Sequence, residues 1–299
     1  MRAFGKVLAF IFVLLLMPVA RASPEKVDVG LYLLDISKYD IRTGEFTADF
    51  YLDFKCSENC SPEGFEFMNG RATSSDLAIN TSNEKFYRIQ GTFGSRVNME
   101  RYPFDRQTIQ IVLEDKLKTK DQLVYFALAN ESGMDDHKNF PGWEIKNWTV
   151  KVDEHYYPPY GETYSRYTFS IEIERIVLNA VLKTFVPLFF IILIALASMF
   201  LSPNEMGFRI TIGGSTLVTT VLLHLNMLSE IPPTPYLTFS DKFMFANYSI
   251  LLLCFLVNIA VQELNVRGRK KEVETVQRYT ELCVLLVPLF YVVLFYLLL

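Results

Sequence analysis

Four long apolar blocks in the second half of the chain constrain its fold more than any other feature. Each block is close to the ~20 residues that an α-helix needs to cross the hydrocarbon core of a bilayer. We therefore expect a multi-pass membrane protein in contact with membrane lipid. The predicted transmembrane helices cover residues 181–201, 210–229, 243–261 and 282–299.

Residues 1–22 have the layout of a secretory signal peptide. Arg2 and Lys6 precede a short apolar run, and the small residues Ala20 and Ala22 stand before the expected cleavage site. A charged start, a short apolar core and an A-x-A site define such segments. The alternative is an uncleaved membrane anchor. Both interpretations export the domain that follows.

Basic residues predict the orientation of the four helices. Export places the N-terminal domain outside, so four crossings return the C-terminus to the outside as well. The loop predicted to lie inside, residues 262–279, holds five basic residues: Arg267, Arg269, Lys270, Lys271 and Arg278. This bias is what the positive-inside rule requires. We expect a plasma-membrane protein with an extracellular N-terminal domain and an extracellular C-terminus.

Residues 23–178 are predicted to form an extracellular β-sandwich, and residues 179–299 the transmembrane domain. Apolar and polar side chains alternate in four segments: 46–55, 108–113, 148–153 and 167–174. Side chains on a strand repeat every two residues, so each segment predicts a half-buried strand. Several strands without long amphipathic helices between them indicate an antiparallel sandwich.

Two of the four cysteines, Cys56 and Cys60, lie close together in the exported domain. Exported domains meet an oxidising environment, so we predict a small disulfide loop, with two free thiols as the alternative. No Cys or His cluster stands nearby to complete a metal site. We expect neither a metal nor a cofactor.

The second apolar block carries a stripe of one helical face. Its members are spaced alternately four and three residues apart: Thr211, Ser215, Val218, Leu222, Leu225 and Ser229. Hydroxyls can replace part of an ion's water shell, and a ring of Val and Leu can close a pore by dewetting. One helix cannot enclose a pore, so this interpretation needs a ring of subunits. The alternative is a packed bundle in which the hydroxyls bond backbone carbonyls.

Four segments stand in a fixed order around the apolar blocks: the loop 101–108, the Ile173-Glu174-Arg175 run with Pro187 in the following helix, the pore-type helix 209–228 and the Pro-rich loop 231–236. They resemble motifs of the pentameric ligand-gated ion channels, the Cys-loop receptor superfamily, and especially its prokaryotic members. The resemblance runs from Val27 to the C-terminus. It implies a homopentameric channel built from a β-sandwich extracellular domain and a four-helix transmembrane bundle.

The sequence departs from the family in three places. No cysteines flank residues 102–105, so the bridge that names the animal receptors is absent, and the short inner loop also resembles prokaryotic members. The stretch 56–97 is short and lacks the Trp-x-Pro of the family's agonist site. Part of the usual ligand pocket is therefore missing.

The resemblance implies a coupling site between the two domains. Asp105 lies in the loop 101–108, here called the signature loop, which also contains Tyr102, and it would pair with Arg175. Asp40, in the first strand-to-strand turn, would join them. Breaking such a partly buried pair leaves a charge unpaired. The alternative is that Asp105 only caps its own turn.

The resemblance also implies a path from the ectodomain to the pore. Pro103 and Phe104 would press on the loop around Pro232, so that movement of the sheet tilts the second helix. At the inner pore entrance, Glu205 would favour cations as the permeating inorganic ions. Arg209 opposes it, although the family often carries a basic residue there that faces away from the lumen.

Candidate ligand residues come from a hairpin that resembles the family's capping loop. They are Tyr156, Tyr157, Tyr160 and Tyr164, with Trp143 before the neighbouring strand. Aromatic faces can hold an organic cation, which suggests a small-molecule agonist. The alternatives are packing against the next subunit, or gating by protons through carboxylates such as Asp35, Asp49 and Glu84. His224 is interpreted as a helix-packing residue.

Two other classes of protein compete with a channel. A non-conducting membrane sensor of the same architecture would need no pore stripe and would carry an inner signalling domain. A membrane enzyme would need a clustered nucleophile, acid–base pair or metal set, and the sequence shows no such motif. Nucleic acid is not an expected partner, because the formal net charge is -4 and no long basic face is visible.

Overall fold

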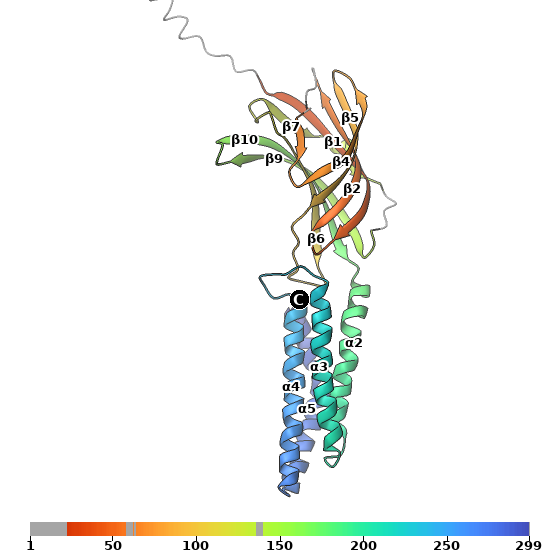
Figure 1. The fold of residues 1–299 in the computed structure, drawn as a ribbon, viewed down its shortest axis with the longest axis vertical. Helices are drawn as coiled ribbons and strands as arrows, with labels where there is room; N and C mark the ends of the chain where they lie inside the picture. Colours follow the sequence, from red (N-terminus) through yellow and green to blue (C-terminus); the bar gives the residue numbers. More distant parts are fainter. Residues whose placement is uncertain (1–22, 58–61, 63, 136–139, 299) are drawn as a thin grey trace, which may run out of the picture.

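The computed structural model describes residues 23–57, 62, 64–135 and 140–298. The predicted signal peptide, residues 1–22, lies outside this range. Cys60 lies outside it too, so its bridge to Cys56 stays a prediction. Within the range the chain forms a β-sheet domain above four long helices (Figure 1).

Two sheets face each other in the N-terminal domain. The larger one has the order β4-β5-β2-β1-β7, with β8 also paired to β1, and the smaller one has the order β3-β6-β10-β9. The larger sheet contains β1 (Glu25–Asp40), β2 (Glu45–Cys56), β4 (Gly70–Asn80), β5 (Glu84–Gly94), β7 (Leu123–Ala127) and β8 (Gly133–Met134). The smaller sheet contains β3 (Phe65–Phe67), β6 (Arg106–Asp115), β9 (Trp143–Tyr157) and β10 (Glu162–Arg175).

Alternating apolar side chains build the core between the sheets. Phe50, Leu52 and Phe54 of β2 are fully buried, as are Phe169 and Ile171 of β10. All four predicted strand segments lie within observed strands. The predicted β-sandwich is therefore confirmed, although β1, β3, β4, β5, β7 and β8 were not predicted. Register shifts interrupt the pairing of β1 with β2 and of β4 with β5.

The four helices are those that hydropathy predicts, with longer ends. They are α2 (Val177–Ala197, followed by the short 3-10 helix η2, Ser198–Phe200), α3 (Met206–Ser229), α4 (Phe239–Val266) and α5 (Lys270–Leu298). Hydropathy identifies only the apolar part of a helix, which lies in the hydrocarbon core, whereas the helix itself extends to a capping residue or a turn. At the start of α4, Thr238 and Asp241 form a capping box outside the apolar block.

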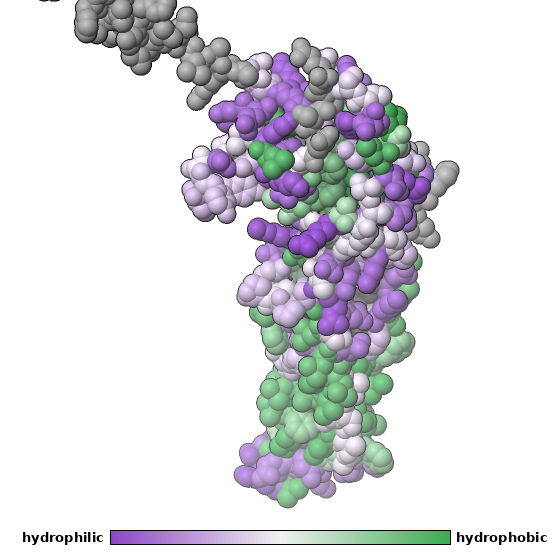
Figure 2. Space-filling view, turned by 45° about the horizontal axis from the view of Figure 1, so that its top comes forward, coloured by the Kyte–Doolittle hydropathy of each residue, from purple (hydrophilic) through white to green (hydrophobic). Residues whose placement is uncertain are grey.

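The surface of the molecule follows the same division. On the face shown in Figure 2, apolar residues cover most of the helices, whereas mostly polar residues cover the sheet domain and the opposite tip of the bundle. The C-terminus lies at the end of the bundle nearest the sheet domain (Figure 1). Four spans of this length and hydropathy make the chain a multi-pass membrane protein.

We predict that Phe50→Ala destabilises the sandwich by about 3–5 kcal/mol, because it opens a cavity among the rings of Phe67 and Phe93. Both tryptophans of the chain lie in β9, so intrinsic fluorescence during heating reports on this domain alone. The exposed Phe126→Ala serves as the control and should leave the transition almost unchanged. Equal losses in the two variants would contradict the assigned core.

Candidate functional site

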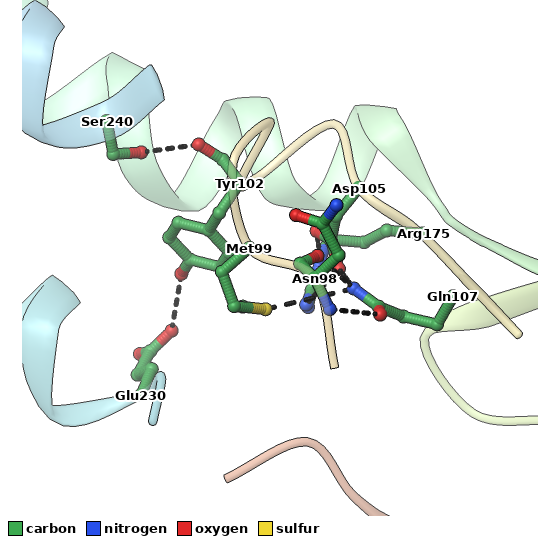
Figure 3. Close-up of polar contacts among 8 residues, drawn as sticks. All are labelled: Asn98, Met99, Tyr102, Asp105, Gln107, Arg175, Glu230 and Ser240. Carbon is green, nitrogen blue, oxygen red and sulfur yellow. Dashed lines mark hydrogen bonds and ion pairs between the residues drawn. The ribbon is translucent and has the colours of Figure 1, made fainter. Parts of the chain in front are cut away.

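The signature loop lies between the sheet domain and the helices. The start of α4 donates hydrogen bonds to backbone carbonyls of this loop and of the residue before it. Phe239 N–H donates to Glu100 O at 2.8 Å. Ser240 donates to Tyr102 O from its backbone N at 3.2 Å and from Oγ at 3.0 Å. Figure 3 shows Tyr102 between Ser240 on one side and Glu230 on the other. The loop thus bonds directly to the transmembrane domain.

An ion pair joins this loop to the last strand. Arg175 Nε donates to Asp105 Oδ1 at 2.7 Å and Nη2 donates to Oδ2 at 3.2 Å. Asp105 is 1% exposed, and its Oδ2 also accepts a hydrogen bond from Gln107 Nε2 at 2.8 Å. The structure therefore brings the predicted pair together, and its part in gating stays a prediction.

Aromatic rings cover the guanidinium of Arg175. The ring centroid of Trp143 lies 4.5 Å from its Cζ, and that of Tyr102 lies 5.2 Å away. Trp143 pairs with Arg175 at the base of the sheet, whereas Tyr156 pairs with Thr163 at the far end of the same two strands. The predicted grouping of Trp143 with the hairpin tyrosines is wrong, because they occupy opposite ends of a long strand.

Asp40 does not join the pair as predicted. Its Oδ1 accepts a hydrogen bond from Arg42 N at 2.9 Å, so it caps its own turn. Among the residues that the structure describes, no ion pair links Asp40 to Arg175. The neighbouring Tyr39, and not Asp40, lies beside the residues around Arg175: its ring centroid is 5.5 Å from that of Trp143.

Tyr102 and Met99 contact the loop between α3 and α4. They form a small apolar cluster with Ile231 and Tyr236. Tyr102 OH donates to Glu230 Oε2 at 3.3 Å, and Met99 N donates to Tyr236 OH at 2.9 Å. Burial, together with the nearby Glu230 carboxylate, raises the pKa of Tyr102 to about 12, so its hydroxyl stays a neutral donor.

Phe104 points elsewhere than predicted. Its ring packs among aromatic rings at the outer ends of three helices, 6.0 Å from Phe185, 5.3 Å from Phe239 and 5.6 Å from Phe295. The predicted contact with Pro232 is therefore replaced by contact with α2, α4 and α5. Pro103, whose peptide bond with Tyr102 is cis, is buried beside it.

Sequence reasoning missed Gln107, which holds the loop from within. Its amide donates to Asn98 O at 2.7 Å and accepts from Asn98 N at 3.0 Å, besides bonding Asp105. Gln107 lies on the inward face of β6, in step with the buried Ile109. A polar residue at an inward position of an alternating strand is the signal that could have identified it.

Helix α3 has two distinct faces. The predicted pore stripe is exposed at every position: Thr211, Ser215, Val218, Leu222, Leu225 and Ser229. The buried face consists of Met206, Arg209, Gly213, Thr216, Thr220, His224 and Met227. Thr216 and Thr220 donate to backbone carbonyls of their own helix on the buried side. On the exposed stripe, the hydroxyls of Thr211 and Ser229 likewise donate to carbonyls of the same helix, so the two sets of hydroxyls differ in exposure and not in this bonding.

Arg209 turns away from the exposed stripe. It is 0% exposed, and its guanidinium donates to the carbonyls of Ser198 and Met199 at 3.2 and 2.7 Å and to Gln277 Oε1 at 2.9 Å. Glu205 immediately before α3 is exposed. At the end of the stripe farther from the sheet domain, the acidic residue is therefore accessible and the basic one is not.

The hairpin of β9 and β10 presents its tyrosines in two ways. Tyr156 and Tyr160 are exposed. Tyr157 OH instead donates to Glu114 Oε2 at 2.9 Å, and Tyr164 OH donates to Glu162 Oε2 at 2.6 Å. Two rings are free to meet a partner or a ligand, and two hydroxyls are already bonded to carboxylates.

A β-sandwich bonded through such a loop to four membrane-spanning helices, one of them with an unpacked polar-to-apolar stripe, defines the subunit of a pentameric ligand-gated ion channel. Comparison with known proteins agrees. The chain is 22% identical over 265 residues to the proton-gated ion channel of Gloeobacter violaceus, covering 80% of this chain and 73% of that protein. No protein-family model matches it.

Animal receptors are similar over shorter stretches. Identity is 22% over 197 residues with the gamma-aminobutyric acid receptor subunit beta-4 of Gallus gallus, and 24% over 162 residues with the pH-sensitive chloride channel 2 of Drosophila melanogaster. The matches span 40% and 31% of those two proteins. In sequence and in architecture the chain is therefore similar to pentameric ligand-gated ion channels, and the relatives it matches are named as channels and receptors, not as enzymes.

We predict that Asp105→Ala destabilises the sheet domain by about 3 kcal/mol, because it leaves the partly buried guanidinium of Arg175 without a counter-charge. The matched control is the exposed Arg106–Glu174 pair, whose N–O distance is 3.2 Å. Arg106→Met should cost less than about 1 kcal/mol, since water already screens that pair. Thermal unfolding followed by tryptophan fluorescence measures both. Similar losses would show that the Asp105 pair does not hold the domain base.

Proposed function

We propose that five copies of this chain form a homopentameric, cation-selective channel in the plasma membrane, with α3 lining the pore and the sheet domain and C-terminus outside. The observation that carries the proposal is the division of α3 into two faces. Within one subunit its buried face meets α2 and α4, whereas the stripe from Thr211 to Ser229 lies exposed. A ring of subunits would turn that stripe toward a common axis.

A second exposed surface supports assembly. Strand β4, at the edge of the larger sheet, is exposed along nearly its whole length, including Leu77 and Ile79. A long exposed edge strand is a liability unless a partner covers it. Contact with a neighbouring copy would provide that cover.

The stripe would supply both a gate and an ion path. Its inner end carries the hydroxyls of Thr211 and Ser215, and its middle carries Val218, Leu222 and Leu225. A ring of such apolar side chains can close a narrow channel by excluding water.

Selectivity for cations rests on this chain's own residues, because the relatives include a protein named as a chloride channel. A ring of five Glu205 carboxylates would attract cations at the inner mouth. Arg209 would not line that mouth, since its guanidinium is buried and bonded to two carbonyl oxygens and Gln277.

The test is current recording from the purified protein in planar bilayers under a salt gradient. We expect a reversal potential close to the equilibrium potential of the cation. Glu205→Gln should move it toward the equilibrium potential of chloride, because the substitution removes the carboxylate ring. Arg209 is unsuitable as a control because it is buried, so the exposed Asn204→Ala next to Glu205 serves instead. A reversal potential at the chloride value would overturn cation selectivity. Monomeric particles, or pentamers without current under pH and amine steps, would overturn the channel.

Protons are the agonist that the sheet domain favours most. Asp53 of β2 is 7% exposed, and its Oδ1 has no hydrogen-bond partner in the part of the chain that the structure describes. Its Oδ2 lies 3.3 Å from Lys55 Nζ, which also contacts Glu131 and lies 4.0 Å from Glu84. Gly30 permits this arrangement, because a Cβ there would lie 3.3 Å from that of Glu131.

Burial raises the pKa of Asp53 to about 6, and Lys55 only partly offsets this. The folded-state pKa therefore exceeds the usual value of 3.8, so protonation stabilises the fold. The stabilisation is complete below that usual value and is lost as pH rises through about 6.

We predict that the difference in stability between the wild type and Asp53→Asn changes by up to about 3 kcal/mol between pH 7.5 and pH 4, as judged from ~1.4 kcal/mol per pKa unit. The wild type gains relative to the variant as pH falls, because the amide does not titrate. Fluorescence-detected unfolding across this pH range measures the difference. If Asp53 also contributes to proton activation, the variant shifts the pH of half-maximal current. A pH-independent stability difference would show that Asp53 has an ordinary pKa.

The exposed rings of Tyr156 and Tyr160 support a small organic cation as a second agonist class. Amine steps at constant pH distinguish it from protons. Loss of an amine response in Tyr160→Ala, with the proton response kept, would assign that site.

A further inference from the structure

A hydrogen-bonded triad lies buried between the pore-type helix and the next helix. His224 of α3 bonds through Nε2 to Asp241 Oδ1 at 3.0 Å and through Nδ1 to Tyr248 OH at 2.9 Å. Asp241 and Tyr248 both belong to α4. His224 and Asp241 are 8% and 7% exposed, so water contributes little to satisfying them. None of the proposed steps of conduction or selectivity uses these groups.

Each oxygen of Asp241 has a separate partner. Oδ2 accepts from Thr238 N at 2.8 Å and from Thr238 Oγ1 at 2.9 Å, which closes the cap of α4. Oδ1 faces His224. One carboxylate therefore ties the first turn of α4 to the pore-type helix, and it cannot move without disturbing both.

The same first turn of α4 also forms hydrogen bonds with the sheet domain. Phe239 N and Ser240 lie between Thr238 and Asp241 in the chain, and they donate to the carbonyls of Glu100 and Tyr102. Only one residue separates the backbone contact at Phe239 from Asp241. A displacement of the signature loop thus reaches Asp241 within a single rigid helical turn.

We propose that His224, Asp241 and Tyr248 form a relay that positions the outer half of the pore-type helix relative to the ectodomain. His224 acts here as a positioning residue, not as a residue that touches the permeating ion. The relay adds a second connection to that through Glu230 and Ile231, and it rests on the proposed role of α3 as the pore wall.

The geometry specifies the tautomer of His224. A carboxylate only accepts hydrogen bonds, so Nε2 carries a proton, and in the neutral ring Nδ1 accepts from the Tyr248 hydroxyl. In Asp241→Asn, the two donors of Thr238 keep the amide oxygen in the cap, so the amide nitrogen faces His224. Nε2 must then accept, and the proton moves to Nδ1.

Nitrogen-15 NMR of histidine-labelled protein in liposomes tests this without any agonist. The chain has three histidines, and His224→Gln identifies the signal of interest. We expect an Nε2–H ring in the wild type, a shifted Nδ1 signal in Tyr248→Phe and an Nδ1–H ring in Asp241→Asn. The exposed Tyr296→Phe is the control and should change nothing. A His224 signal that ignores both α4 substitutions would overturn the relay.

Coupling is measured in channels that leak without agonist. Leu222→Ser places a hydroxyl in the apolar part of the stripe and should allow water and ions through. In that background, Ser240→Ala perturbs the ectodomain contact. We expect its effect on open probability to differ by at least about two-fold between channels with His224 intact and channels with Tyr248→Phe or His224→Leu.

A histidine with a merely structural role would lower stability but leave the effect of Ser240→Ala unchanged, and that result would overturn the proposal. Tyr248→Phe removes a single hydroxyl and keeps the ring, so it decides the matter if His224→Leu fails to assemble. If Leu222→Ser pentamers do not conduct, the pore assignment fails with the proposed function. The tautomer pattern then decides whether the relay exists.

Discussion

The ion pair between Asp105 and Arg175 fixes the base of the sheet domain, where the chain passes into the helices. The guanidinium has a carboxylate along one edge and the rings of Tyr102 and Trp143 nearby, and Gln107 bonds the same carboxylate. A buried pair is favourable only when such additional contacts replace the lost water. Because α2 begins two residues after Arg175, the pair fixes the point at which the sheet becomes a helix.

Beyond that junction, α3 has a buried face that packs against its neighbours and an exposed face that does not. Gly213 of α3 lets Phe255 of α4 approach closely, since a Cβ at that position would lie 3.1 Å from the Phe255 ring. Arg209 is held on the same buried face by two carbonyls and Gln277. The exposed stripe is consequently free of basic residues. The packing of one subunit thus determines which side chains a ring of subunits would present to ions.

Hydropathy predicted the spans, strand alternation predicted the sandwich, and helical spacing predicted the exposed stripe. Each of these signals is a property of a contiguous segment of sequence. The pairing of Asp105 with Arg175 came from the family resemblance. What sequence could not predict depends on which elements meet. Asp40 is used by its own turn, Phe104 enters the ends of three helices, and Trp143 covers Arg175. These partners lie far apart in sequence, and no local period encodes their contact.

Two of the connections from the signature loop into the helices lead to α3. One is mainly side-chain packing of Tyr102 against Ile231, beside a long hydrogen bond from Tyr102 OH to Glu230, and packing is non-directional and tolerates sliding. The other consists of directional hydrogen bonds through the cap of α4 to His224, which weaken steeply once their geometry is lost. A soft contact transmits displacement gradually, whereas a bonded relay is either made or broken. If the relay acts as proposed, their combination would let the outer end of α3 switch between two positions, which is the property that a two-state gate requires.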